Sequence, residues 1–123
     1  MTIRKVDFVG IRTSRLNETV ALFRDVLKVP VARQTENLVG FKFGDGAVLE
    51  LYGPEDEFHA FFATGPVVGF RVDDFDAARG AMVAAGITFL GEIQHANGEA
   101  WQHFRSPDGT ILEIIGSVVG ATD

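Results

Sequence analysis

The sequence of 123 residues contains no cysteine, which excludes disulfide bonds and any chemistry that needs a thiolate. It also contains no block of clustered lysine and arginine, and its formal net charge is −6. Nucleic-acid binding is therefore disfavoured, because neutralising a phosphate backbone requires such clusters. The acidic balance would suit a cationic ligand, but a general need for solubility is the preferred explanation.

Long apolar runs are absent as well. No run approaches the roughly 20 residues that a membrane-spanning helix needs, and no apolar segment typical of a signal peptide follows the charged start MTIRKVDFVG. We therefore expect a soluble, cytoplasmic protein. The patterns GxSxG, GxxxxGK[ST], HExxH and CxxC do not occur, so serine-nucleophile, nucleotide-binding and zinc-protease functions have no support.

Hydrophobic residues, by contrast, are plentiful. They make up 46% of the chain, and phenylalanine alone accounts for 11 residues. This content excludes intrinsic disorder, and the length is sufficient for one domain with its own core. We expect a single domain over residues 1–123.

The chain repeats itself at two places. VGIR at 9–12 returns as VGFR at 68–71, and GDGAVLELYG at 44–53 returns as PDGTILEIIG at 107–116. Both decamers carry Asp-Gly, a Leu-Glu core and a final Gly, which indicates two copies of one structural module. Each module ends with a glutamate inside an aliphatic strand, where a carboxylate is rare unless it has a partner.

Two segments have the periodicity of helices. Thr13 or Ser14 is placed to cap the first helix, whereas Asp73 or Asp74 would cap the second and Gly86 would end it. We expect their apolar stripes to face the core rather than a ligand. These stripes consist of Leu16, Val20, Phe23 and Leu27 in the first helix and of Phe75, Ala78, Met82 and Ala85 in the second.

Strand patterns separated by turns follow each helix. GDG at 44–46, NG at 97–98 and PDG at 107–109 have the chemistry of hairpin turns. Each half is thus predicted to run strand, helix, strand, strand, strand. The strands predicted after the helices cover residues 30–36, 38–43 and 47–52 in the first half and 87–94, 99–105 and 110–115 in the second.

The modules are predicted at 3–53 and 66–117, joined by a linker over 54–65. Gly-Pro pairs flank this linker, and a short helix over its middle, EDEFHAFF, is one option.

The segments FRSPDGTILEI and FKFGDGAVLEL, within a tandem βαβββ arrangement over about residues 4–116, give the chain a family resemblance. It resembles the vicinal oxygen chelate superfamily, which includes glyoxalase I, extradiol dioxygenases, fosfomycin-resistance thiol transferases and bleomycin-resistance proteins. The resemblance implies an α+β fold in which the two βαβββ modules curl into half-barrels that enclose a cleft. It does not imply one function, because a fold of this kind hosts unrelated chemistries.

By resemblance, the family's metal ligands fall on Phe8, Glu50, Val67 and Glu113. Phenylalanine and valine have no donor atom, and a divalent metal usually needs at least three protein donors. We therefore expect the usual metal site to be incomplete and no cofactor to be bound. A rebuilt divalent-metal site from Glu50, His103 and Glu113 is the weaker alternative.

Two arginines are expected to share the cleft face, since strand side chains alternate with period 2. Arg12 and Arg71 lie four residues past the first-strand ligand positions, and by resemblance this is the place of the substrate-carboxylate arginine of glyoxalase I. The alternative is that each arginine neutralises one of the two glutamates.

The PDG turn decides which residue faces Glu113. With a three-residue loop, Ser106 faces Thr110 and His103 falls opposite Glu113; with a two-residue loop, Phe104 would do so. We prefer the first register. His103 would then be either a general acid/base tuned by Glu113, which makes the two residues the candidate catalytic pair, or a structural partner of the carboxylate.

The sequence indicates no specific role for the two other histidines. His95, beside the NG turn, is expected at the surface, and His59, in the linker, is expected to face solvent or to pack on the cleft rim. Aromatic side chains have two readings, core packing or the wall of an apolar site. The candidates for ligand contact are Tyr52, Phe58, Phe62 and Trp101, together with Phe8, Arg12, Glu50, Val67 and Arg71.

Three functions remain open. The first is binding of a small aromatic or amphipathic molecule without turnover, as bleomycin-resistance proteins bind their antibiotic. The second is an enzyme of the same superfamily, a lyase, isomerase or dioxygenase. The third is a regulatory or structural homodimer that pairs through FHAFF at 58–62. We prefer the first, with a small-molecule ligand and a homodimer as the expected assembly.

Overall fold

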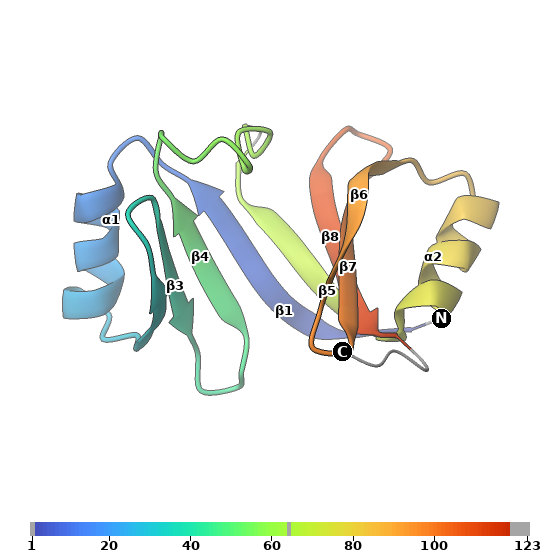
Figure 1. The fold of residues 1–123 in the computed structure, drawn as a ribbon, viewed down its shortest axis with the longest axis horizontal. Helices are drawn as coiled ribbons and strands as arrows, with labels where there is room; N and C mark the ends of the chain where they lie inside the picture. The colour runs from blue at the N-terminus through green and yellow to red at the C-terminus, as the bar shows by residue number, and fades with distance from the viewer. Residues whose placement is uncertain (1, 64, 119–123) are drawn as a thin grey trace. The chain divides into compact units, whose positions relative to one another are not determined.

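The computed structural model describes residues 2–63 and 65–118 (Figure 1), and within it the chain divides into two units. The first unit comprises residues 8–67; the second comprises residues 1–7 together with 68–123. The predicted linker at 54–65 includes residue 64, which lies outside the described residues. Strand β1 (Ile3–Arg12) contributes its first residues to the second unit and the remainder to the first.

Each unit contains a four-stranded mixed sheet with one helical segment. In the first unit the strand order is β2-β3-β4-β1, and in the second it is β5-β8-β7-β6. The pairs β1/β4 and β5/β8 are parallel, whereas the pairs β2/β3, β3/β4, β6/β7 and β7/β8 are antiparallel. The elements are α1 (Leu16–Ala21), η1 (Leu22–Val26), β2 (Val31–Gln34), β3 (Leu38–Lys42), β4 (Val48–Tyr52), β5 (Val67–Asp74), α2 (Phe75–Ala84), β6 (Phe89–Ala96), β7 (Glu99–Arg105) and β8 (Ile111–Ser117). The predicted α+β class and the twofold βαβββ order are confirmed.

The first helical segment changes its geometry part-way. After α1, the turn η1 is π-helical, and the Leu27 amide donates to the carbonyl of Leu22 at 2.9 Å. A π turn holds an extra residue, so it rotates the following side chains away from the 3.6-residue stripe. Leu27 is consequently 54% exposed, and its predicted place in the core is wrong. Val29 packs against the core instead.

The start of α1 also departs from the prediction. Its N-cap is Arg15, which makes no side-chain capping bond, whereas the Thr13 hydroxyl accepts a hydrogen bond from the Arg15 amide at 3.0 Å. Thr13 therefore closes a local turn before the helix instead of capping it.

The second helix has the predicted ends. The Asp74 carboxylate accepts a hydrogen bond from the Ala77 amide at 3.0 Å, which is an N-cap. Gly86 follows the C-cap with φ of +90°, a conformation that favours glycine. Ala85, expected in the core, is the exposed C-cap residue of the helix.

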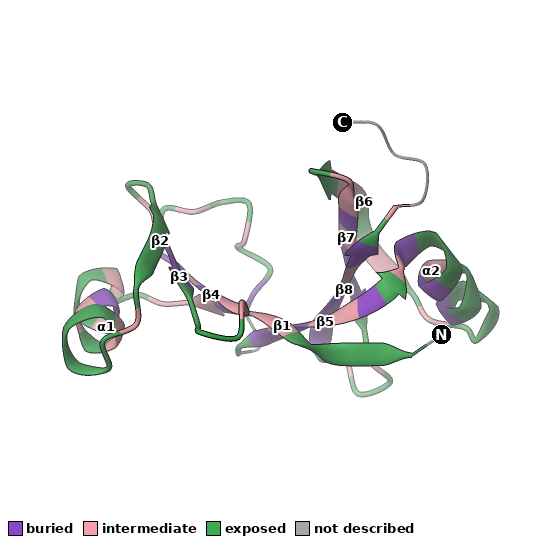
Figure 2. Ribbon diagram, turned by 90° about the horizontal axis from the view of Figure 1, so that it is seen from below, coloured by how far each residue is buried: buried purple, intermediate pink, exposed green. Residues whose placement is uncertain are grey.

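Each helix covers one face of its own sheet, as the buried positions in Figure 2 show. Odd and even strand positions point to opposite faces, so the core residues of each unit identify the face that meets the helix. The core of the first unit consists of Val20, Val39, Phe41, Leu49 and Leu51. That of the second consists of Val72, Phe75, Ala78, Met82, Ala100, Phe104 and Ile114. Their strand neighbours, including both repeated glutamates, lie on the opposite face.

In the described residues, no helix has the length and apolar character that crossing a membrane would require.

Candidate functional site

Glu50 lies between two glycines on the sheet face that the helix leaves open. It pairs in register with Gly10 of β1 on one side and with Gly40 of β3 on the other. A Cβ at Gly40 would come within 3.6 Å of Glu50 Oε2, so the missing side chain leaves room beside the carboxylate. The Glu50 side chain is 17% exposed, which is low for a carboxylate.

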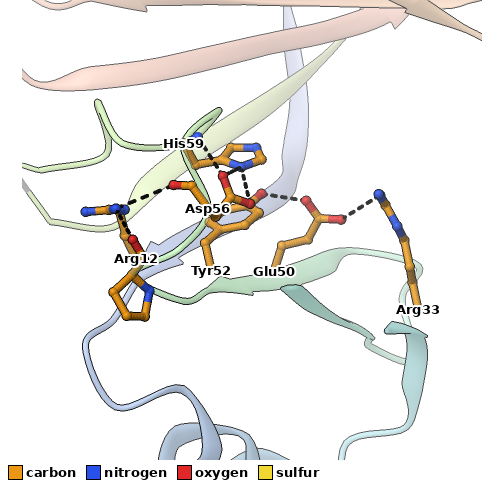
Figure 3. Close-up of polar contacts among 7 residues, drawn as sticks. Arg12, Arg33, Glu50, Tyr52, Asp56 and His59 are labelled. Carbon is orange, nitrogen blue, oxygen red and sulfur yellow. Dashed lines mark hydrogen bonds and ion pairs between the residues drawn. The ribbon is translucent and has the colours of Figure 1, made fainter. Parts of the chain in front are cut away.

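The Glu50 carboxylate has both a donor and a cation beside it (Figure 3). The Tyr52 hydroxyl donates a hydrogen bond to Glu50 Oε1 at 2.5 Å. Arg33, on β2, places Nη1 at 3.6 Å from Glu50 Oε2, and its side chain is 62% exposed. Neither partner covers the carboxylate fully, so Glu50 keeps accepting capacity for a further donor.

The linker folds back onto the side of the sheet that carries Tyr52. The ring of His59 stacks on Tyr52, with centroids 3.6 Å apart and planes at 12°. Phe62 meets Tyr52 edge-on at 5.5 Å, and a Cβ at Gly10 would come within 2.6 Å of the Phe62 ring. His59 therefore does not face solvent: its side chain is 15% exposed. We call Tyr52, Phe58, His59, Phe61 and Phe62 the linker cluster.

Hydrogen-bonded turns, not a helix, shape this linker. The amides of Asp56, Ala60 and Phe62 donate to carbonyls three residues earlier, at 3.0 to 3.2 Å. The optional short helix over 55–62 is therefore wrong. Phe58 is 60% exposed, whereas Phe62 is only 3% exposed, so the phenylalanines have different environments.

Arg12 binds the linker through backbone carbonyl groups. Its Nη2 donates to the carbonyl of Pro54 at 2.9 Å and approaches that of Asp56 at 3.4 Å (Figure 3). Its Nε is buried and has no hydrogen-bond partner within the described residues. A guanidinium can bridge successive carbonyls in this way because its donors are fixed in one plane.

The second unit has a histidine–glutamate pair in its sheet. His103 of β7 lies directly opposite Glu113 of β8, with Nε2 at 3.1 Å from Oε2. The residues are 8% and 5% exposed. Ser106 donates its amide to the Thr110 carbonyl at 2.9 Å, which is the three-residue loop expected for the PDG turn. The predicted register is confirmed.

Arg71 has different partners from those considered. Its Nη1 donates to Glu99 at 2.6 Å and its Nε to Asp7 at 2.9 Å. The hydrogen bond to Glu99 is the main cause that raises the pKa of Arg71 above its usual value; burial opposes it and Asp7 adds to it. In the described chain, the contacts of Arg12 and Arg71 go to these groups, so the idea that each neutralises a repeated glutamate is wrong.

The other residues proposed from the sequence have these positions. Phe8 pairs with Val48 on the open face of the first sheet, and Val67 is fully buried. Trp101 lies opposite Ile115 and is half-buried, on the same face as His103. His95 is exposed on β6, as expected.

The residues at the family's metal positions do not fit a divalent ion. Phe8 and Val67 offer no donor atom, and one oxygen of Glu50 already accepts from Tyr52 at 2.5 Å. Within residues 2–63 and 65–118, no group of three His, Cys, Asp or Glu residues is arranged to hold a metal ion.

Three contributors were missed at the sequence level: Asp56, Arg33 and Gly40. Asp56 and His59 form an Asp-x-x-His spacing, which places a carboxylate near an imidazole whenever the chain makes a turn there. The repeat could have identified Gly40 as the equivalent of His103. Gly40 stands 63 residues before His103, the same offset that relates Glu50 to Glu113.

The sequence matches the family model of the Glyoxalase/Bleomycin resistance protein/Dioxygenase superfamily over residues 5–114. The chain belongs to this superfamily. The expected resemblance is therefore confirmed, and the match spans both βαβββ modules. No curated protein shows significant sequence similarity to this superfamily member.

Solved structures agree on the fold. Methylmalonyl-CoA epimerase from Mycobacterium tuberculosis is 20% identical, with a TM-score of 0.73 over 94% of this chain and 89% of that one. A glyoxalase/bleomycin resistance protein/dioxygenase superfamily member from Vibrio splendidus is also 20% identical, with a TM-score of 0.64 over 95% and 100%. A protein from Legionella pneumophila described as an NAD-dependent benzaldehyde dehydrogenase is 15% identical, with a TM-score of 0.64 over 89% and 97%. Identities this low establish the shared fold and no shared activity.

Proposed function

We propose that this superfamily member binds a small aromatic or amphipathic molecule on the open face of its first unit. The observation that carries the proposal is the position of Glu50 between Gly10 and Gly40, with its carboxylate held by Tyr52 at 2.5 Å. A sheet face that served only packing would carry apolar side chains there, because a half-buried carboxylate costs solvation.

The linker cluster supplies the apolar part of such a site. Small-molecule sites combine aromatic walls with a few placed polar groups. Tyr52 and Phe62 are buried, while Phe58 is 60% exposed. Glu50 supplies the polar group, and its negative charge favours ligands that carry an N–H donor or a positive charge.

The test is calorimetric titration of the purified protein with a panel of planar aromatic compounds, both neutral and cationic. We expect at least one class to bind. The Phe58→Ala variant should lower its affinity about fivefold, because a well-placed aromatic contact contributes on the order of 1 kcal/mol. Phe43→Ala is the matched control, since Phe43 is 39% exposed in the β3–β4 turn, outside the linker cluster. No binding across the panel would contradict the proposal.

Glu50→Gln separates the charge from the shape of the site. It keeps the volume of the side chain and its ability to accept from Tyr52, and it removes the negative charge. Cationic members of the panel should lose about tenfold or more in affinity, since a charge-assisted hydrogen bond is roughly twice as strong as a neutral one. Neutral members should change little. Glu36→Gln, at an exposed position, is the control.

A second candidate function is acid/base catalysis by a lyase or isomerase. The observation that favours it is the buried His103–Glu113 pair, in which an imidazole and a carboxylate lie 3.1 Å apart. A carboxylate stabilises the protonated imidazole and so allows proton transfer to and from a bound molecule. Epimerases among the structurally similar proteins make an isomerase reasonable to test.

The test compares binding with turnover. A compound that binds the wild-type protein is incubated in D₂O and followed by NMR for exchange or conversion. If the second candidate is right, His103→Ala keeps the affinity and loses the conversion. Elemental analysis of the purified protein checks the metal-dependent branch, including the set Glu50, His103 and Glu113; protein without stoichiometric metal would remove that branch.

A further inference from the structure

His59 is a histidine for which the sequence suggested no role, and the structure holds its ring in one orientation. Nδ1 lies 3.0 and 3.1 Å from the two carboxylate oxygens of Asp56. The His59 backbone amide donates to the same carboxylate at 2.8 Å. The carboxylate thus restrains both the backbone and the side chain of His59.

Aromatic contacts restrain the ring further. One face of the imidazole stacks on Tyr52 at 3.6 Å, while Phe58 and Phe62 approach edge-on at 4.8 and 5.1 Å. Rings packed in this way lose their rotameric freedom before any ligand arrives. The imidazole is therefore preorganised.

The support of this ring continues into the sheet. Arg12 donates to the carbonyls of Pro54 and Asp56, and the Asp56 amide donates to the carbonyl of Gly53 at 3.1 Å. These bonds hold the backbone of the residue that orients the imidazole. Arg12 and Asp56 are positioning residues in this arrangement.

The orientation determines the chemistry of the other ring nitrogen. A neutral imidazole with its Nδ1 against a carboxylate carries its proton on Nδ1, so Nε2 presents a lone pair. Figure 3 shows Nδ1 turned to Asp56 and the opposite edge of the ring turned away from it. In the described chain, the ring hydrogen bonds of His59 all go to Nδ1, and Nε2 is not one of the buried atoms without a partner. Nε2 is therefore not sealed from solvent, and its lone pair is available to an incoming donor.

We propose that His59 Nε2 is the acceptor that selects the ligand, and that the ligand is an aromatic molecule with an N–H or O–H donor on its ring. This rests on the proposed small-molecule binding function. The aromatic class follows from the rings that surround His59, and the donor follows from the lone pair on Nε2. Glu50 remains the charged group of the proposed site, and the His103–Glu113 pair takes no part in this recognition.

The first experiment measures the tautomer without any ligand. In protein labelled with ¹⁵N, the ring nitrogens of neutral His59 should have the shifts of an Nδ1–H tautomer. In Asp56→Asn, that preference should weaken, because the amide is a poorer acceptor for the ring N–H than the carboxylate. A dominant Nε2–H tautomer in the wild-type protein would overturn the inference, whatever the ligand is.

The second experiment uses two matched pairs of probes: indole with 1-methylindole, and 4-methylphenol with 4-methylanisole. Within each pair, methylation removes the donor and keeps the ring. We expect the donor compound to bind about tenfold tighter, which corresponds to about 1.4 kcal/mol and lies within the range of one hydrogen bond. The indole pair tests an N–H donor, and the phenol pair tests an O–H donor.

Variants assign the difference to His59. His59→Phe keeps a stacked ring on Tyr52 and removes the acceptor, so both members of each pair should bind equally well. His95→Phe, at the exposed histidine of β6, should keep the tenfold preference. Equal binding of donor and methylated probes to the wild-type protein overturns the inference and leaves the proposed function standing. Failure of these probes and of the whole aromatic panel overturns both.

Discussion

The two units build the same four-stranded arrangement and differ in what faces the repeated glutamate. In the second unit, Glu113 meets His103 across the β7–β8 ladder. In the first unit the corresponding neighbour of Glu50 is Gly40, and the imidazole comes from the linker, where it stacks on Tyr52. In the second unit a strand residue thus contacts the carboxylate, whereas in the first unit space remains beside it.

This difference shows how a duplicated module acquires two uses. The helix-facing residues repeat in kind, because each sheet must bury one apolar face. The opposite face is free of that requirement, so its side chains diverge without loss of the fold. We propose ligand binding on this face of the first unit. The second candidate function, acid/base catalysis, would use the corresponding face of the second unit.

The largest losses of stability are expected from substitutions in the two cores, and these losses should be similar in both units. Phe41 and Phe75 are both fully buried, one in each core. Phe41→Ala and Phe75→Ala should each lower the free energy of unfolding by about 3–5 kcal/mol, measured in urea. Val26→Ala, at a side chain that is 69% exposed, should stay within about 0.5 kcal/mol. A loss below about 1 kcal/mol in either core variant would show that the units are unequal in packing.

Substitution of Gly53 and Gly116, which end the two repeated decamers, should destabilise the protein to different extents. A Cβ at Gly116 would lie 2.6 Å from the Val72 carbonyl oxygen, which is backbone, whereas at Gly53 it would lie 3.1 Å from the end of the Leu16 side chain. A side-chain end can move and a buried strand cannot. Gly116→Ala should therefore cost about 1–3 kcal/mol, and Gly53→Ala less than about 1 kcal/mol. Equal losses in urea unfolding would contradict this difference.

Variants at the N-caps of the two helices should also change the free energy of unfolding by different amounts, and this difference should be smaller. Asp74 caps α2 through the Ala77 amide, while Arg15 at the start of α1 makes no capping bond. Asp74→Ala should lower the free energy of unfolding by about 1 kcal/mol. Arg15→Ala should lower it by only a few tenths, since its exposed pair with Glu18 is worth about that much. Thermal and urea unfolding measure both, and an equal effect would mean that α1 is capped in solution.

The smallest expected effect on stability comes from a difference between the two hairpin turns, and it depends on pH. Ser106, where the first unit has Phe43, donates its hydroxyl to Asp108, and this bond together with the Thr110 amide lowers the pKa of Asp108 from 3.8 to about 2. Because the folded pKa is the lower one, this stabilisation is complete above about pH 4 and is lost as the pH falls toward 2.

Asp108→Asn tests this directly. The variant should destabilise the protein slightly at pH 5 and have a smaller effect at pH 2, measured as the urea midpoint at both values. Ser106→Ala should reproduce part of the change. A difference between wild type and Asp108→Asn that is the same at both pH values would contradict the lowered pKa.

Much of the fold was predictable from local patterns. The repeats indicated two βαβββ modules, and the alternation around Glu50 and Glu113 placed both on the face away from the helix. The His103–Glu113 register followed from the three-residue loop at PDG, because loop length fixes which residues of a hairpin face each other. The Asp74 cap and the Gly86 stop are likewise local, since each depends on residues within one turn of the helix.

Other features did not follow from these patterns. Leu27 leaves the core because η1 is a π turn, and Val29 packs there instead. Arg12 meets the carbonyls of Pro54 and Asp56 because the linker returns over its strand.

By itself, the sequence determined the class, the duplicated module and the side of each sheet on which the glutamates lie, since these follow from the periods of strands and helices. Only the tertiary structure decided that a linker histidine lies on Tyr52, held by Asp56, and that Gly40 leaves room beside Glu50. The physical reason is that strand pairing is read from neighbours along the chain, whereas the position of a linker side chain depends on contacts with residues distant in sequence.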